Sequence, residues 1–243
     1  MHSPSRSLIL AGAVSALGAA LLAAILAGAL NQASSAQAAL AALGATLVPA
    51  GALALAWGER QSMGKEIGPA NWVTFSRGAL GASAGGVGLL AFAMPLSTGL
   101  LWAVVVLSIL ALCMDGLDGW AARRFDCASP FGARLDMELD GMTTAALCVL
   151  AWSSGAAGAW ILLSGAMRGL FILAARLWPW MDRPLFPSQR RRVVCVIQIA
   201  TLIAACAPLF SSISAWVAGA GLAALIYSFG VDTYWLYTHR ERP

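Results

Sequence analysis

Charged residues are scarce in this chain: Asp, Glu, Lys and Arg make up only 11% of its 243 residues, against about 25% in a typical soluble protein. So few charges cannot cover the surface of a globular domain of this size in water. Disorder is excluded by the same composition, because disordered chains are polar and poor in aromatic residues. With 60% hydrophobic residues and a mean hydropathy of +0.77, the sequence predicts an all-α integral membrane protein.

Histidine is almost absent, and the cysteines show no pairing pattern. His2 and His239 are the two histidines, so we do not expect histidine-based catalysis. The five cysteines include no C-x-x-C pair and have no histidine beside them, which argues against a disulfide framework or a zinc site. Neither G-x-S-x-G nor G-x-x-x-x-G-K-[ST] occurs, so neither a nucleophile elbow nor a P-loop is indicated.

Long apolar runs dominate the sequence, and a membrane-spanning helix needs about 20 such residues. We expect eight helices, at about 8–30, 37–57, 72–94, 98–117, 139–157, 158–178, 193–210 and 213–236. The first run exceeds the roughly 7–15 apolar residues of a signal peptide, which favours a membrane helix over a signal cleaved near Ala38. The predicted parts are two N-terminal transmembrane helices (1–57), a polar cytoplasmic or interfacial segment (58–71) and a six-helix block (72–238).

The positive charges fall in alternate connections, and all basic residues except Lys65 are arginines. Charge is found in 58–71, 119–136, 179–192 and the C-terminal tail, and the intervening connections carry none. By the positive-inside rule, the charged loops and both termini are expected in the cytoplasm, for a multi-pass protein of an inner (plasma) membrane. The net charge of +4 is therefore attributed to topology and phosphate binding, and no nucleic-acid partner is expected.

The most informative segment is MDGLDGWAARRFDCASPFGARLDMELDG, residues 114–141. Asp115 and Asp118 are three positions apart, and Asp136 and Asp140 are four apart, so on helices each pair projects from one face. We expect the two helices to be antiparallel neighbours joined by a short connection, so that the four carboxylates converge at the membrane boundary. There they repel one another unless a cation neutralises them. Oxygen ligands without Cys or His favour a hard ion, Mg²⁺, Mn²⁺ or Ca²⁺.

Small residues and an arginine accompany the acidic pairs. Gly119 and Gly132 lack side chains and let a ligand approach the backbone, and Arg123 follows Asp118 by about one helical turn. A divalent metal beside a positioned arginine is one way to hold a pyrophosphate or a transferring phosphoryl group. The alternative, interfacial acids paired with nearby arginines, would rarely produce this spacing.

The pattern Asp115-x2-Asp118-Gly119-x2-Ala122-Arg123-x8-Gly132-x3-Asp136-x3-Asp140 resembles, at every fixed position, the signature of the CDP-alcohol phosphotransferase (CDP-alcohol phosphatidyltransferase) family. The resemblance implies a six-helix catalytic membrane core, formed by the last six predicted helices, and leaves the two N-terminal helices unexplained. It also implies transfer of a phosphatidyl group from a CDP-linked donor, usually CDP-diacylglycerol, to an alcohol, with release of CMP.

Residue roles follow from the same resemblance. Asp115, Asp118 and Asp136 would bind Mg²⁺ or Mn²⁺, and Asp140 would bind metal and act as the general base on the acceptor hydroxyl. The donor is expected along Gly119, Ala122, Arg123 and Gly132. These roles are chemically sound, because a metal on the pyrophosphate stabilises the leaving CMP and a carboxylate within hydrogen-bond reach can take the hydroxyl proton.

A second polar pattern opens the first helix of this core. Asn71, Thr74 and Arg77 are spaced by threes and share one helix face. They resemble the family's N-x-x-T-x-x-R entry to that helix, which implies that Asn71 and Thr74 lie near the nucleotide. The structural alternative is a helix N-cap at Asn71, with Thr74 bonded to backbone and Arg77 reaching out to the interface.

Arginines further along are candidates for the acceptor site. Arg168 lies within an apolar run, where a charge usually faces the bundle interior or a watery cavity. Arg190 to Arg192 open the next helix, where similar enzymes place a basic residue that holds the acceptor's phosphate. We therefore name Arg168, Arg191 and Arg192 as acceptor- or phosphate-binding candidates, and a positive-inside anchor is the alternative for the arginine run. Asp232 is interpreted as structural, and the glycine runs 78–81 and 85–88 as tight helix packing.

Several functional alternatives remain open at this level. The acceptor could be glycerol phosphate, inositol phosphate, serine or another phospholipid, and the arginine surplus favours a phosphorylated one. The donor could be CDP-choline or CDP-ethanolamine. A divalent-cation transporter fits less well, because transporter sites lie near the midplane of the membrane and these acids gather at one face. Membrane lipids are expected partners, and dimers are common among similar enzymes, so a homodimer is compatible with the resemblance.

Overall fold

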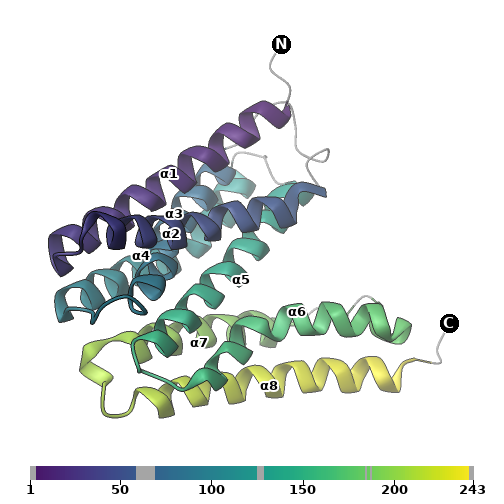
Figure 1. Cartoon of the computed structure of the whole chain (residues 1–243). Coiled ribbons are helices and arrows are strands. Elements are labelled where there is room, and N and C mark those ends of the chain that lie inside the picture. Colours follow the sequence, from purple (N-terminus) through teal and green to yellow (C-terminus); the bar gives the residue numbers. More distant parts are fainter. Residues whose placement is uncertain (1–3, 59–68, 125–128, 184, 187, 241–243) are drawn as a thin grey trace.

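In the part of the chain that it describes, the computed structural model is helical throughout. It describes residues 4–58, 69–124, 129–183, 185–186 and 188–240. The helices are α1 (Pro4–Asn31), α2 (Ser35–Ala56), α3 (Pro69–Leu90), α4 (Thr98–Arg124), α5 (Pro130–Ser153), α6 (Leu162–Leu177), α7 (Gln189–Cys206) and α8 (Ser214–Thr238). Figure 1 shows α1 to α4 as one group and α6 to α8 as another, with α5 between them. The all-α, eight-helix prediction is confirmed.

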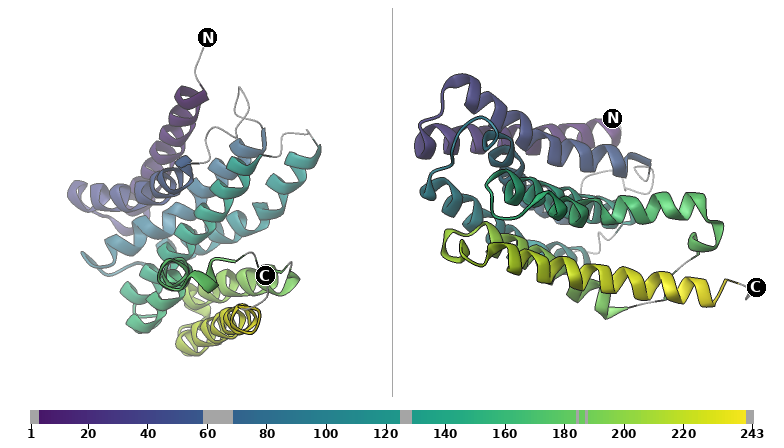
Figure 2. Two further views of the ribbon diagram at one scale, coloured as in Figure 1. Left: turned by 90° about the vertical axis from the view of Figure 1, so that its right-hand side faces the viewer. Right: turned by 60° about the horizontal axis from the view of Figure 1, so that its bottom comes forward.

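Five helical segments are long and apolar enough to cross a membrane: Leu8–Asn31, Ser35–Ala56, Thr98–Asp115, Ala159–Leu177 and Ser214–Thr238. They identify an integral, multi-pass membrane protein. Helices α3, α5 and α7 are less apolar because they carry many of the polar residues discussed below, and α5 packs against α2, α3, α6 and α7. In Figure 1 and in the right view of Figure 2, the beginning of α1 and the end of α8 lie toward the same end of the bundle.

The helices around the acidic motif extend well past the apolar runs that predicted them. Helix α4 continues to Arg124, and α5 begins at Pro130 instead of near residue 139. Ser129 caps α5, its Oγ accepting a hydrogen bond of 3.0 Å from the Gly132 N–H, and Pro130 occupies the first turn, where its missing N–H costs nothing. An apolar run marks the part of a helix in the membrane, and the helix itself continues until its backbone is capped. All four aspartates of the motif therefore lie on helices.

The two N-terminal helices pack on α3 through small residues. A Cβ atom added at Gly86 would lie 2.4 Å from the Ala41 carbonyl oxygen of α2, and one added at Gly44 would lie 2.7 Å from the Gly85 carbonyl oxygen. Only glycine permits such a close approach of two backbones. A polar tie adds to this contact, because Ser15 Oγ of α1 donates to the Phe75 carbonyl of α3 at 2.9 Å. The predicted tight packing of the glycine run 85–88 is confirmed, and α1 and α2 support the helix that carries Arg77.

The substitution Gly86→Leu is expected to destabilise the bundle by about 3 kcal/mol or more, because overpacking at a backbone contact forces helices apart. Size-exclusion chromatography and thermal unfolding in detergent would measure this effect. Gly18→Leu is the matched control, since no heavy atom lies within 4 Å of its added Cβ. A Gly86→Leu variant with the elution profile and Tm of Gly18→Leu would contradict the observed packing of α2 on α3.

Candidate active site

Three carboxylates of the motif converge between α3, α4 and α5. One oxygen from each of Asp115, Asp136 and Asp140 lies within 4.8 Å of the other two. In the described residues α4 and α5 make little direct contact, and each packs extensively against α3. The end of α4 that leads into the connection to α5 has its side chains outside the described residues, so the predicted contact between the two helices there stays a prediction. The acids still meet, because α3 holds both helices and the carboxylates reach across its face.

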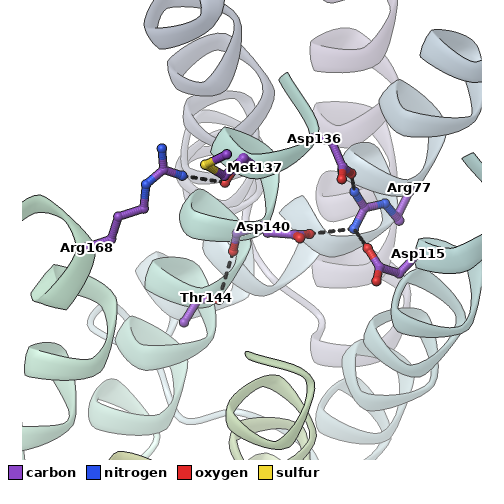
Figure 3. A network of polar contacts seen from close by, with 7 residues as sticks. All are labelled: Arg77, Asp115, Asp136, Met137, Asp140, Thr144 and Arg168. Carbon is purple, nitrogen blue, oxygen red and sulfur yellow. Dashed lines mark hydrogen bonds and ion pairs between the residues drawn. The ribbon is translucent and has the colours of Figure 1, made fainter. Parts of the chain in front are cut away.

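Arg77 of α3 occupies the centre of this acid cluster (Figure 3). Its Nη1 donates to Asp115 Oδ1 at 2.9 Å and to Asp140 Oδ1 at 2.5 Å, and its Nη2 donates to Asp136 Oδ1. The side chain is only 8% exposed, as a charge can be when it is fully paired. The alternative in which Arg77 reaches out to the interface was wrong. Its place on the face of Asn71 and Thr74, inside an apolar helix, was the sequence signal for an inward role.

The donor set of the cluster fits a hard divalent cation. All three groups are carboxylates, the ligands preferred by Mg²⁺ and Mn²⁺, and they already surround a cationic guanidinium. One positive and three negative side chains leave a formal charge of −2, which one divalent ion would cancel. The fourth predicted ligand, Asp118, lies on α4 one turn beyond Asp115, and its side chain is outside the described residues, as are the side chains of Ala122 and Arg123 and the surroundings of Gly119.

Asn71 and Gly132 lie against each other at the start of α3 and α5. Asn71 is buried, and a Cβ atom added at Gly132 would lie 2.8 Å from its Oδ1. Gly132 therefore lets α5 approach this amide closely. Because α3 begins at Pro69, Asn71 lies inside the first turn and is not the N-cap that the structural alternative required. Thr74 is also buried on this face, so both predicted nucleotide-binding residues of α3 point into the bundle.

Glu138 organises the opposite face of α5, and it was not among the predicted site residues. Its Oε1 accepts a hydrogen bond of 2.8 Å from Arg168 Nη2 of α6 and forms an ion pair at 2.8 Å with Arg134 Nε, one turn earlier on α5. Arg168 Nη1 also donates to the Met137 carbonyl at 2.8 Å (Figure 3). The spacing of four between Arg134 and Glu138 was the available sequence signal. Arg168 faces the bundle interior, as expected for a charge within an apolar run.

A cavity of about 220 Å³ opens between α5, α6, α7 and α8. Its lining includes Asp140, Arg168 and Arg191, so Asp140 takes part in both the acid cluster and the cavity. Arg191 Nη2 donates to the Phe186 carbonyl, and its Nη1 lies 3.6 Å from Asp232 Oδ1. Arg192 is exposed and is not part of this lining.

Asp232 anchors the beginning of α7. This buried carboxylate of α8 accepts a hydrogen bond of 2.5 Å from Arg190 Nη2. The pair connects α7 to α8 near the arginine run, which agrees with the structural interpretation of Asp232.

A helical membrane protein with carboxylates arranged around a cation, beside an arginine-lined cavity, has the features of an enzyme that handles phosphate groups through a divalent metal. The family model described as CDP-alcohol phosphatidyltransferase matches residues 68–227. This is more than half of the chain, and the protein therefore belongs to the CDP-alcohol phosphatidyltransferase family, whose members are transferases of phospholipid synthesis.

Two curated relatives, both from Arabidopsis thaliana, match a shorter stretch. They are named CDP-diacylglycerol–inositol 3-phosphatidyltransferase 1, 51% identical over 45 residues, and probable CDP-diacylglycerol–inositol 3-phosphatidyltransferase 2, 47% identical over 45 residues. Each match covers 18% of this chain and 20% of the relative, so the chain is similar to a fifth of their length. No solved structure matches the chain.

Proposed function

We propose that this enzyme transfers a phosphatidyl group from CDP-diacylglycerol to an alcohol acceptor and releases CMP. The observation that carries the proposal is the double position of Asp140. It belongs to an acid cluster suited to a metal and pyrophosphate, and it lines the neighbouring cavity, which suits an acceptor. The positive-inside distribution of the arginines supports an active site at the cytoplasmic face of a plasma membrane, with both termini cytoplasmic.

Asp115, Asp136 and Asp140, together with Asp118, are the proposed ligands of Mg²⁺, with Mn²⁺ as an alternative. A divalent ion bound there would polarise the donor's phosphates and neutralise charge on the leaving CMP. The protein itself holds the carboxylates close together and neutralises part of their negative charge. Arg77 does this through its bonds to all three described carboxylates.

The donor nucleotide is assigned to the side of the cluster formed by the first turns of α3 and α5. The close approach of Gly132 to Asn71, and the burial of Thr74 one turn further on, support this assignment. The glycine lets the Asn71 amide lie directly against the first turn of α5. The proposed donor-binding residues are Asn71, Thr74, Gly119, Ala122, Arg123 and Gly132.

Asp140 is the proposed general base. In the reaction the acceptor hydroxyl oxygen forms a bond to the phosphorus that carries the diacylglycerol, the bond from that phosphorus to the CMP oxygen breaks, and CMP leaves with the electron pair. The hydroxyl proton passes to the Asp140 carboxylate, which lies where the cavity meets the cluster. The hydrogen bond from Arg77 Nη1 to Asp140 Oδ1 keeps this carboxylate oriented.

The acceptor is assigned to the cavity, where Arg168 and Arg191 line the wall with Asp140. Glu138 fixes the direction of Arg168 through their 2.8 Å contact. Because Arg192 is exposed and outside the lining, the proposed role in acceptor binding rests on Arg168 and Arg191. The relatives are named for inositol as acceptor, which puts inositol first among the acceptors to test.

CMP release by the purified protein in detergent micelles tests this function. The assay contains CDP-diacylglycerol and Mg²⁺, with inositol, inositol 1-phosphate, glycerol 3-phosphate or serine added singly. We expect CMP release that depends on one acceptor and is lost on addition of EDTA. Release from CDP-choline or CDP-ethanolamine alone would place the enzyme in the other donor branch of the family. The absence of CMP release with every combination of donor and acceptor would overturn the proposal.

A further inference from the structure

Ser108 of α4 is buried within a membrane-spanning segment and has no hydrogen-bond partner among the described residues. It lies inside the span Thr98–Asp115 and is 2% exposed, and its Oγ makes no hydrogen bond. Bulk water does not reach a hydroxyl at this depth, and a buried polar group without a partner is costly. Because buried polar groups are nearly always hydrogen-bonded, this hydroxyl calls for a partner.

Hydroxyl groups on the neighbouring helices bond to their own backbone. Ser83 Oγ of α3 donates to the Leu80 carbonyl at 2.7 Å, and Thr144 Oγ1 of α5 donates to the Asp140 carbonyl at 2.8 Å. A bond to the preceding turn is a common solution for Ser and Thr inside a helix. Ser108 makes no such bond, and its side chain instead lines a small cavity between α3, α4, α5 and α7.

This small cavity adjoins the acid cluster and has the size of a water site. Besides Ser108, its polar lining consists of Arg77, Asp115, Asp140 and Thr143, and the rest of its wall is apolar. About 20 Å³ of it is open to the centres of water molecules. One water needs about 10–15 Å³ of such space and two to four polar partners. The small cavity therefore has room for one or two waters beside groups that can bond to them.

Helix geometry places polar groups at both ends of the small cavity. Ser108 and Asp115 are seven positions apart on one face of α4, about 10 Å along the helix axis, which is too far for a direct hydrogen bond. Helical side chains tilt toward the N-terminus of their helix, so Asp115 leans back toward the turn between the two residues. On α5, Thr143 follows Asp140 by three positions and leans toward it. Water is the group that can connect Ser108 to these residues.

We propose that Ser108 binds one or two buried waters in the small cavity, and that this water donates hydrogen bonds to the carboxylates of the acid cluster. A carboxylate has room for about four hydrogen bonds, and those from Arg77 Nη1 reach one oxygen each of Asp115 and Asp140. The water holds these groups from the side of the membrane interior. Ser108 is thus a positioning residue, and this role rests on the proposed function, in which Asp115 and Asp140 bind metal.

The substitution Ser108→Ala removes the hydroxyl that anchors the water. We expect the Mg²⁺ concentration for a half-maximal Tm shift to rise about threefold or more, because a water-mediated bond that orients the carboxylates is lost. The kcat for CMP release should fall, with the KM for CDP-diacylglycerol unchanged. Ser83→Ala is the matched control, since it removes a fully buried hydroxyl that bonds within its own helix. Equal Mg²⁺ midpoints in the two variants would overturn the positioning role.

The water itself can be observed directly. A high-resolution crystal structure of the wild type is expected to show an ordered water about 2.7–3.0 Å from Ser108 Oγ, and that of Ser108→Ala should show this water lost or displaced. An empty cavity in the wild type would overturn the inference. So would a rise in the Tm of Ser108→Ala in EDTA, because it would show that the hydroxyl had been buried without any partner.

These measurements separate the inference from the proposed function. The ordered water and the Mg²⁺ midpoint are both read without turnover. An enzyme that releases CMP but has an empty small cavity would overturn the role of Ser108 and leave the transferase intact. A bound water and a shifted Mg²⁺ midpoint, in a protein that releases no CMP with any donor or acceptor, would support the role of Ser108 and count against the transferase.

Discussion

Replacing Asp140 by Asn is expected to lower the rate of CMP release about 1,000-fold or more, the contribution of a positioned general base together with a charged ligand. The amide cannot take the proton of the acceptor hydroxyl, and it weakens the carboxylate set that surrounds Arg77. Steady-state CMP release at saturating donor and acceptor measures the effect. The loss should appear in kcat, because the shape of the cavity is preserved by an isosteric side chain.

Asp182→Asn is the matched control for this experiment, because Asp182 is exposed and is not part of the acid cluster. It should retain the rate of the wild type. The Tm of Asp140→Asn shows whether the variant is folded. A folded Asp140→Asn variant with a tenth or more of the wild-type kcat would remove Asp140 from the role of base.

Replacing Arg77 by Met is expected to destabilise the protein by about 3 kcal/mol in EDTA, since loss of one partner from a buried ion pair leaves the other charges uncompensated. Three converging carboxylates would then repel one another without their internal cation. Mg²⁺ should restore more stability to Arg77→Met than it adds to the wild type, because the ion then replaces the missing positive charge. Thermal unfolding in EDTA and in a Mg²⁺ titration measures both effects.

Arg176→Met serves as the control for Arg77→Met, because Arg176 is exposed at the end of α6. Equal Tm values for Arg77→Met and Arg176→Met in EDTA would show that Arg77 does not neutralise the cluster. A Mg²⁺ effect of the same size in the wild type and in Arg77→Met would show that the ion binds elsewhere. In either case another group would have to compensate the negative charge of the three carboxylates.

Much of the site was predictable because its information is local. The spacings of Asp115 and Asp118 on one helix, and of Asp136 and Asp140 on the next, determine which faces carry the acids. The apolar runs predicted the helices, and the scarcity of charge identified the membrane class. The spacing of residues along a helix determines which of its faces they share, independently of how the helix packs against the rest of the chain.

The partners of these residues depended on tertiary structure. Arg77 bonds to Asp115 and Asp140, which are 38 and 63 positions away in the sequence, and both α4 and α5 pack against α3, the helix that carries it. Glu138 accepts a hydrogen bond from Arg168, which lies 30 positions further along the sequence.

The sequence by itself determined the membrane class, the helical content, the signature of the family and the faces on which the aspartates lie, because each depends on composition or on spacing within one helix. Only the tertiary structure decided that Arg77 fills the acid cluster, that α1 and α2 support α3, and that Asp140 takes part in both the cluster and the neighbouring cavity. The physical reason is that burial and charge pairing are set by which helices pack together, and this packing depends on small residues and side-chain contacts far apart along the chain.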